Sequence, residues 1–202
     1  MTSLAVATGA NRLAQDALME LVNIGSGNAL SSLSRLVGGD CLMPSVPEMM
    51  TSEAVTDLAD LDADGIVVSM TVVGAVECVM MMLFEQRSAL ELVAELLNRD
   101  PLMLRLGPEE EGALAEAVNI ISCSFLGALA SMLRGVLIPS PPTTAQGRLA
   151  DVTRDRLGAG TWALTNRFAA VRGGLSGRVV LTGDDVAAGK ILAALGVSAS
   201  AS

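Results

Sequence analysis

Residues 20–36 read ELVNIGSGNALSSLSRL and residues 116–133 read EAVNIISCSFLGALASML, so one short pattern occurs twice in this chain. Each copy has a Glu, an Asn three positions later and an Ile directly after the Asn, and the second copy begins 96 residues after the first. Residues three apart in a helix lie about 60° apart around its axis, so each Glu and its Asn project from one face. A polar pair repeated in two otherwise apolar helices predicts two equivalent sites on a pseudo-symmetric molecule.

The overall composition excludes several classes of function. The 202 residues carry a net charge of −9 and include no His. A chain without His cannot build a His-based catalytic triad and lacks the commonest metal ligand. Nucleic-acid binding needs a basic stripe, and the 13 Lys and Arg residues are scattered, so we expect no nucleic-acid partner. An acidic surface instead suits a protein partner that carries a basic patch.

The cysteines and the N-terminal residues favour the cytoplasm. Cys41, Cys78 and Cys123 are odd in number and widely spaced, which predicts free thiols in a reducing compartment rather than a disulfide framework. The first residues, MTSLAVATGANR, have no basic stretch followed by a long apolar core, so no secretory signal is expected. We therefore expect a cytoplasmic protein.

One apolar segment raises the alternative of a membrane-anchored protein. Residues 65–84 read GIVVSMTVVGAVECVMMMLF, which is long enough to span a bilayer as a helix. The β-branched residues, Gly74 near the middle and Glu77 in the interior favour two buried strands joined around Gly74. We expect these strands, and no membrane insertion.

Both halves of the chain predict the same order of elements. In the first half we expect a helix at 11–37, an extended proline-bounded stretch, a short polar helical segment at 51–61, strands near 65–73 and 75–84, and a helix at 87–98. After a break at NRDPLMLRLGPEEE we expect a helix at 108–133, the extended proline-rich turn IPSPPTTAQG, a short polar helix near 148–157, strands near 160–171 and 174–182, and a helix at 184–195.

The repeat predicts an α+β fold with one shared sheet. Each half carries too few strands to bury both faces by itself. We therefore expect a single domain over 1–202 with internal repeats at about 11–98 and 108–196. Two long helices would flank one mainly antiparallel sheet with pseudo-two-fold symmetry.

The first helix separates its residues into two faces. A packed face is predicted from Ala14, Leu18, Leu21, Gly25, Ala29, Ser32 and Leu36, and a polar side from Asp16, Glu20, Asn23, Gly27 and Ser34. Asn11 would cap the start of this helix, and Gly38-Gly39 would end it. The IGSGN run lacks the GK[ST] ending of a phosphate-binding loop and lies inside the helix. Gly27 instead permits a partner to approach closely, and Cys123 holds the same place in the second copy.

The paired Glu and Asn suit assistance of a reaction rather than covalent chemistry. Surface helices carry such residues routinely, but Asn is a poor residue for a helix interior, and here it recurs in register with Glu. A carboxamide can orient a water molecule through its donor and acceptor together. A carboxylate can pair with a Lys of a partner or act as a base. Because neither group is a strong nucleophile, we expect the reactive group to belong to a partner.

The repeated pattern resembles the motif of the CheC/CheX/FliY group of chemotaxis phosphatases, Asp/Ser-x3-Glu-x2-Asn-x22-Pro. The first copy supplies Asp16, Glu20 and Asn23, with its proline one residue late at Pro47. Two motif copies, the chain length and the element order are all similar to a CheC-like protein. The resemblance spans nearly the whole chain.

The second copy departs from the motif at a different place. It supplies Glu116, Asn119 and Pro142 at the family spacing, but Gly112 replaces the leading Asp or Ser. The missing acid would weaken the second site, and the late proline would shift the loop beside the first. Which of the two sites is stronger stays open at this point.

The resemblance implies a phosphatase for the aspartyl phosphate of a CheY-type response regulator, in chemotaxis or related two-component signalling. Asn23 and Asn119 would orient the attacking water, and Glu20 and Glu116 would dock the active-site Lys of the regulator. The regulator would supply Mg²⁺, so no cofactor of its own is expected. Phosphoryl transfer rewards this kind of positioning and charge neutralisation.

Supporting roles and an alternative function also follow from the resemblance. Asp16 would support the first site, and Pro47 and Pro142 would terminate the turns after the motif helices. A CheD-like deamidase is a further possible partner. The alternative is a non-catalytic adaptor of the same fold that binds a receiver or a CheD-like protein. It would need Glu20 and Glu116 for affinity, without using the Asn residues for turnover.

Overall fold

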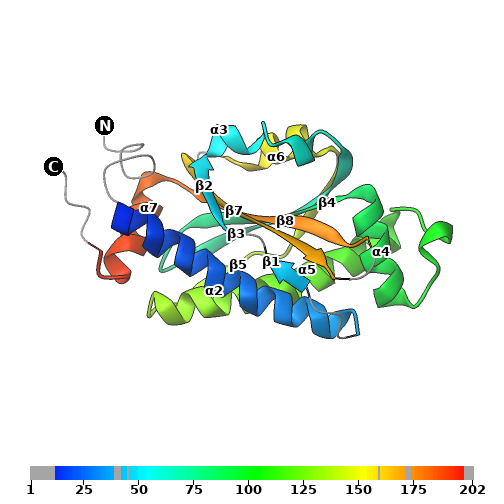
Figure 1. Cartoon of the computed structure of the whole chain (residues 1–202), viewed down its shortest axis with the longest axis horizontal. Coiled ribbons are helices and arrows are strands. Elements are labelled where there is room, and N and C mark those ends of the chain that lie inside the picture. Colours follow the sequence, from blue (N-terminus) through cyan, green and yellow to red (C-terminus); the bar gives the residue numbers. More distant parts are fainter. Residues whose placement is uncertain (1–11, 39–41, 45, 159, 172–173, 198–202) are drawn as a thin grey trace.

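The computed structural model describes residues 12–38, 42–44, 46–158, 160–171 and 174–197, and the side chains of 42–44 lie outside this description. Two long helices lie side by side against one face of a sheet, and short helices cover the other face (Figure 1). The first-half elements are α2 (Arg12–Leu36), β1 (Leu42–Pro44), β2 (Glu48–Thr51), α3 (Ser52–Val55), η1 (Ala59–Leu61), β3 (Asp64–Gly74), β4 (Cys78–Glu85) and α4 (Gln86–Leu97). The second-half elements are η2 (Pro101–Met103), α5 (Pro108–Met132), β5 (Leu137–Pro139), β6 (Thr143–Arg148), α6 (Leu149–Arg156), β7 (Trp162–Ala170), β8 (Ser176–Gly183) and α7 (Asp185–Ala194).

The two faces predicted for α2 are confirmed. Ala14, Leu18, Leu21, Gly25, Ala29 and Ser32 are buried and Leu36 is half-buried, whereas Asp16, Glu20, Asn23 and Gly27 are exposed and Ser34 is half-buried. Gly38 follows the helix with φ of +81°, a conformation in which glycine is favoured at a helix end. The predicted N-cap Asn11 and the second glycine, Gly39, lie outside the described residues.

The two halves share one antiparallel sheet by exchanging their edge strands. Among the described residues the sheet has eight strands in the order β1-β7-β8-β4-β3-β5, with β2 also paired to β7 and β6 also paired to β3. The first-half strands β1 and β2 therefore pair with the second-half strand β7, and β5 and β6 pair with the first-half strand β3. One antiparallel sheet built from strands of both halves and flanked by helices confirms the predicted fold class.

Each edge of the sheet is a strand interrupted by proline. Pro47 directly precedes β2, and Pro142 directly precedes β6. Because Pro has no backbone N–H, it cannot continue a hydrogen-bonded ladder and is confined to edges and breaks. The prediction of a proline-rich turn after the second motif helix was therefore incomplete, since much of that stretch forms β5 and β6.

The repeat extends into these broken edge strands. LMPSVP at 42–47 corresponds to LIPSPP at 137–142. Residues 37–41 connect α2 to β1, whereas 133–136 connect α5 to β5, one residue fewer. The late proline of the first copy thus results from an extra residue between helix and strand, because the strand segments themselves match.

The apolar segment at 65–84 lies inside the sheet. It forms most of β3 and β4, which pair from Gly65 with Glu85 to Val72 with Cys78, and Gly74 ends β3 with φ of +122°. The prediction of two strands is confirmed, and the alternative of a membrane anchor at this segment is wrong. Among the described residues, α5 is the one helix long and apolar enough to cross a membrane, and its buried side chains pack in the core.

Two apolar cores lie on opposite faces of the sheet. The larger one joins the sheet to α2, α4, α5 and α7, and the smaller one joins it to α3, η1 and α6. Beside the smaller core, the buried Arg178 on β8 donates hydrogen bonds to Asp60 in η1, at 2.8 Å from Oδ1 and 2.9 Å from Oδ2. Arg178 also donates to Thr165 Oγ1 at 2.8 Å. This ion pair ties η1 to the sheet.

Candidate functional site on the paired motif helices

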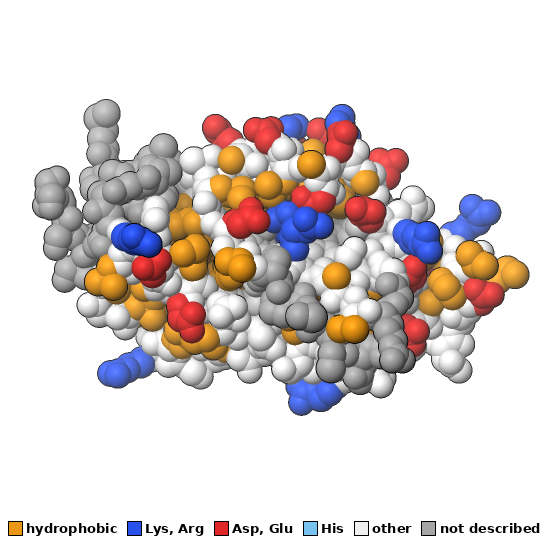
Figure 2. Space-filling model, in the orientation of Figure 1, with side chains coloured by type: hydrophobic (Ala, Val, Ile, Leu, Met, Phe, Trp, Pro, Cys, Tyr) orange, Lys and Arg blue, Asp and Glu red, His pale blue; other side chains and the backbone are white. Residues whose placement is uncertain are grey.

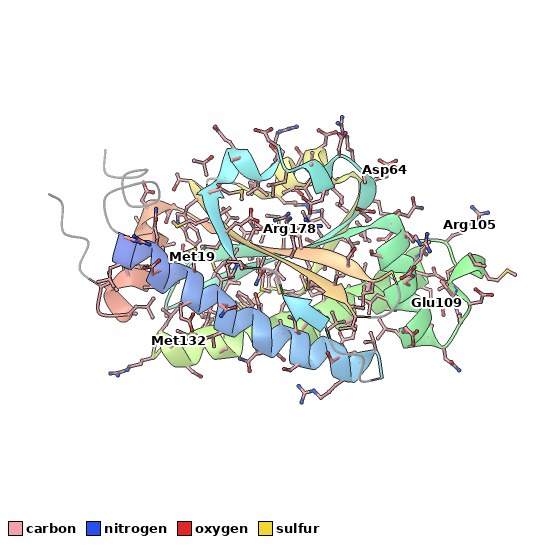
Figure 3. All side chains as sticks on the ribbon, in the orientation of Figure 1. Met19, Asp64, Arg105, Glu109, Met132 and Arg178 are labelled. Carbon is pink, nitrogen blue, oxygen red and sulfur yellow. The ribbon has the colours of Figure 1, made fainter. Side chains whose placement is uncertain are left out.

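The two motif helices pack against each other in opposite directions. Ser32 Oγ on α2 lies 2.6 Å from Ser124 Oγ on α5. Seven residues earlier on α2, Gly25 lies against Phe125 and Leu129, so the partner residue number falls as the α2 number rises. Figure 3 labels Met19 early on α2 and Met132 at the end of α5, and both lie at the same end of the helix pair.

The first site is a stripe on the solvent side of α2. Asp16, Glu20, Asn23 and Gly27 follow one another at intervals of three or four residues, and all four are exposed. A Cβ atom built on Gly27 would meet no heavy atom within 4 Å. The carboxylate of Glu20 and the carboxamide of Asn23 are thus accessible to a partner that approaches along the stripe.

The second site has the same layout on α5. Glu116 is exposed and Asn119 is half-buried. Cys123 takes the place of Gly27, and its thiol donates a long hydrogen bond of 3.9 Å to Asn119 Oδ1. Gly112, which stands where the first copy has an acid, is exposed and has open space around it.

The structure does not bring the two sites together. Because α2 and α5 are antiparallel, Asn23 and Asn119 lie toward opposite ends of the helix pair. From the register, about 12 residues separate them along the axis, which corresponds to roughly 20 Å at 1.5 Å per residue. The two Glu–Asn pairs are therefore too far apart to form a single site.

The predicted supporting prolines lie after the motif helices, directly before β2 and β6. Pro47 is buried and Pro142 is half-buried, each at the break in an edge strand. They set the path of the chain after each motif helix.

Two exposed isoleucines adjoin the sites. Ile24 follows Asn23 and is 37% exposed, and Ile120 follows Asn119 and is 41% exposed. Large apolar side chains at matching exposed places provide contact area for a protein partner. The sequence shows an Ile directly after both Asn residues, but this recurrence alone does not indicate contact with a partner.

The rest of the surface in view offers little competing chemistry. Figure 2 shows basic side chains flanked by acidic ones over the sheet, in the area where Figure 3 labels Arg178. There the guanidinium of Arg178 is already bound by Asp60. Among the described residues, no group of three or more His, Cys, Asp or Glu side chains could hold a metal ion.

Comparison with known proteins gives a family match over the first copy of the motif. The sequence model of the CheC-like family matches residues 13–48, which include all of α2 except its first residue, and β1. No curated protein matches the sequence. FliY from Thermotoga maritima is similar with a TM-score of 0.74 and 14% identity, covering 94% of this chain and 98% of that chain.

Two further solved structures have the same fold over a smaller part of this chain. CheX from Desulfovibrio desulfuricans has a TM-score of 0.59 and 15% identity, covering 80% of this chain and 97% of that one. A chain of the CheX–CheY–BeF3–Mg²⁺ complex from Borrelia burgdorferi has a TM-score of 0.57 and 17% identity, covering 81% and 97%. At these identities the structural likeness shows the fold alone.

Fold and site together define a class of protein: a pseudo-symmetric α+β domain with one Glu–Asn stripe on each of two antiparallel helices. The family match falls on the helix that carries the first stripe. The fold is shared with the FliY and CheX structures.

Proposed function

We propose that this protein is a phosphatase that hydrolyses the aspartyl phosphate of a CheY-type response regulator in chemotaxis or related two-component signalling. The observation that carries the proposal is the Glu–Asn pair, which occurs twice at the same helical spacing; Glu20, Asn23 and Glu116 are exposed and Asn119 is half-buried. Among the described residues no group of side chains could hold a metal ion, and the thiol beside the second pair, Cys123, is hydrogen-bonded to Asn119. The pairs therefore suit assistance to a reactive group on a partner.

The nature of the partner is supported by a similar structure. One solved relative of the fold is CheX in a complex with CheY, BeF3 and Mg²⁺. A phosphorylated receiver domain of the CheY kind is accordingly the proposed substrate, and the cytoplasm is the proposed location. The receiver supplies its own Mg²⁺, which neutralises charge on the phosphoryl group.

The proposed mechanism uses this chain for positioning. Asn23 or Asn119 accepts a hydrogen bond from one water molecule and donates another to it, so that the water lies in line with the phosphorus. Glu20 or Glu116 pairs with the active-site Lys of the receiver and fixes the docked orientation. Ordering a water in this way removes part of the entropic barrier without a covalent intermediate on the phosphatase.

Loss of a labelled phosphoryl group tests the proposal. A CheY-type receiver is phosphorylated with labelled acetyl phosphate, and its decay is followed with and without this protein. We expect wild type to accelerate the decay and the Asn23→Ala/Asn119→Ala protein to give the spontaneous rate. Binding of the receiver without any acceleration by wild type would instead support the adaptor.

The adaptor is the second candidate function, and one observation favours it. The second site lacks the leading acid of the motif and has its Asn in contact with a thiol. A domain that binds a receiver or a CheD-like deamidase without hydrolysis would tolerate such changes. In that case Glu20→Ala and Glu116→Ala would weaken binding, and the Asn variants would have no effect on it.

A further inference from the structure

The two sites differ at the residue one helical turn after the Asn. In the first site this residue is Gly27, and a Cβ atom there would meet nothing within 4 Å. In the second site it is Cys123, an exposed thiol whose Sγ lies 3.9 Å from Asn119 Oδ1. The same place on the stripe is thus open in one site and filled in the other.

The thiol affects the group that the proposed mechanism uses. A carboxamide orients a water molecule only if its oxygen can accept and its nitrogen can donate. The Cys123 S–H competes for the Asn119 oxygen, although it is a weak donor. Its side chain also occupies space beside the carboxamide, where Gly27 leaves room in the first site.

A second difference points in the same direction. Asp16 and Gly112 both lie one turn before the Glu of their site, and both are exposed. The first site therefore presents two carboxylates to the Lys of a receiver, whereas the second presents only Glu116 on its stripe. Asn23 is also exposed where Asn119 is half-buried.

We infer that the residue one turn after the Asn sets the turnover of each site, and that the Gly27 site is the faster one. Cys123 is a positioning residue that lowers turnover at Asn119. The inference rests on the proposed function, because it concerns the rate at which each site dephosphorylates a receiver.

Single-site proteins provide the test. Asn119→Ala leaves only the first site, and Asn23→Ala leaves only the second. We expect the protein with the first site to keep most of the acceleration. The protein with the second site should be slower by about tenfold, less than the roughly hundredfold that a 1 Å misplacement of a reacting group can cost. The difference should lie in kcat more than in KM.

Exchange of the two residues isolates their effect. Cys123→Gly or Cys123→Ala in the Asn23→Ala protein should raise kcat, and Gly27→Cys in the Asn119→Ala protein should lower it. The Ala variant removes the thiol while it keeps a good helix former. Gly189→Cys on α7 is the matched control, since Gly189 is also exposed with nothing within 4 Å of an added Cβ.

The possible outcomes separate the inference from the proposed function. Equal kcat for the two single-site proteins, or exchanges that leave kcat unchanged, would overturn the inference while the phosphatase remains. A slow second site that speeds up when the thiol is removed would support it. Failure of wild type to accelerate decay would remove the proposed function and the inference together.

Discussion

Gly25 on α2 lies directly against Leu129 on α5: a Cβ atom added to Gly25 would be 2.7 Å from Leu129 Cδ1 and 2.8 Å from Phe125 Cε2. The helices approach closely at a point where a side chain has no room. This contact fixes the rotation of α2 about its axis. The stripe with Glu20 and Asn23 consequently faces solvent.

The first prediction concerns this contact. Gly25→Ala should lower the free energy of unfolding by about 1–3 kcal/mol, because the added methyl group overpacks the interface with Phe125 and Leu129. Gly27→Ala is the matched control on the same helix, with open space around the new Cβ. It should raise the free energy of unfolding by about 0.5–1 kcal/mol, since Ala favours a helix interior over Gly. Denaturant titration measures both, and equal effects would contradict the packing described.

The second prediction concerns the buried ion pair of the smaller core. Asp60→Ala leaves the guanidinium of Arg178 without its carboxylate, and the Arg178 side chain is only 4% exposed. We expect a loss of about 3 kcal/mol in the free energy of unfolding. This is the lower end of the range for removal of one partner from a buried ion pair, because Asp60 is partly exposed.

Asp62→Ala is the control for Asp60→Ala, two residues away. Asp62 pairs with Arg148, and both side chains are more than half exposed. Exposed pairs contribute less than about 1 kcal/mol. Thermal or denaturant unfolding that gave the same loss for both variants would show that the Arg178 pair is not the stronger one.

The third prediction follows from the burial of Cys78. Desolvation by burial raises the pKa of this thiol from 9.0 to about 12, so it stays protonated in the folded protein at pH values where the unfolded chain is ionised. Unfolding then releases a proton, and stability falls as pH rises above about 9, by up to about 1.4 kcal/mol per pH unit. Well below pH 9 the thiol is protonated in both states and has no effect on stability.

Comparison of wild type with Cys78→Ala measures this dependence. The difference in free energy of unfolding between the two proteins should narrow from pH 9 to pH 11. A thiol reagent at pH 8 should also modify the exposed Cys123 in the folded protein and spare Cys78, whose reactive thiolate is suppressed. Rapid modification of Cys78 in the folded state would contradict its placement.

The fourth prediction separates docking from turnover at the first site. In the Asn119→Ala protein, Glu20→Gln keeps the size of the side chain and removes its charge. We expect KM for the phosphorylated receiver to rise by about tenfold, with a smaller change in kcat, as for loss of one partner in an interfacial charge pair. The effect should shrink at high salt. A fall in kcat at unchanged KM would assign Glu20 to the chemical step instead.

Helical and strand periodicity was enough to predict most of the fold. The pattern around Glu20 and Asn23 predicted both faces of α2, and the β-branched run at 65–84 predicted β3 and β4. The broken edge strands were harder to predict from the sequence, because a stretch such as LIPSPP has a proline content typical of loops. Their pairing with the other half of the chain depends on contacts far apart in sequence, which periodicity does not report.

The candidate site could likewise be predicted only in part from the sequence. The Glu–Asn spacing predicted which side chains share a stripe, since the geometry of one helix decides that. The opposite direction of the two stripes depends on how α2 packs on α5 through Gly25. Arg178 and Asp60, which are 118 residues apart, could not be paired from the sequence. The contact of Cys123 with Asn119 required the side-chain conformations as well.

In the proposed mechanism, the side chains of Asn23 and Asn119 accelerate hydrolysis of an aspartyl phosphate on the receiver. The most direct measurement is the decay of a CheY-type receiver labelled with acetyl phosphate, in the presence of wild type and of the Asn23→Ala/Asn119→Ala protein. We expect acceleration by wild type, and the spontaneous rate for the double variant although it still binds the receiver. A double variant that accelerates decay as wild type does would show that the Asn side chains are not responsible.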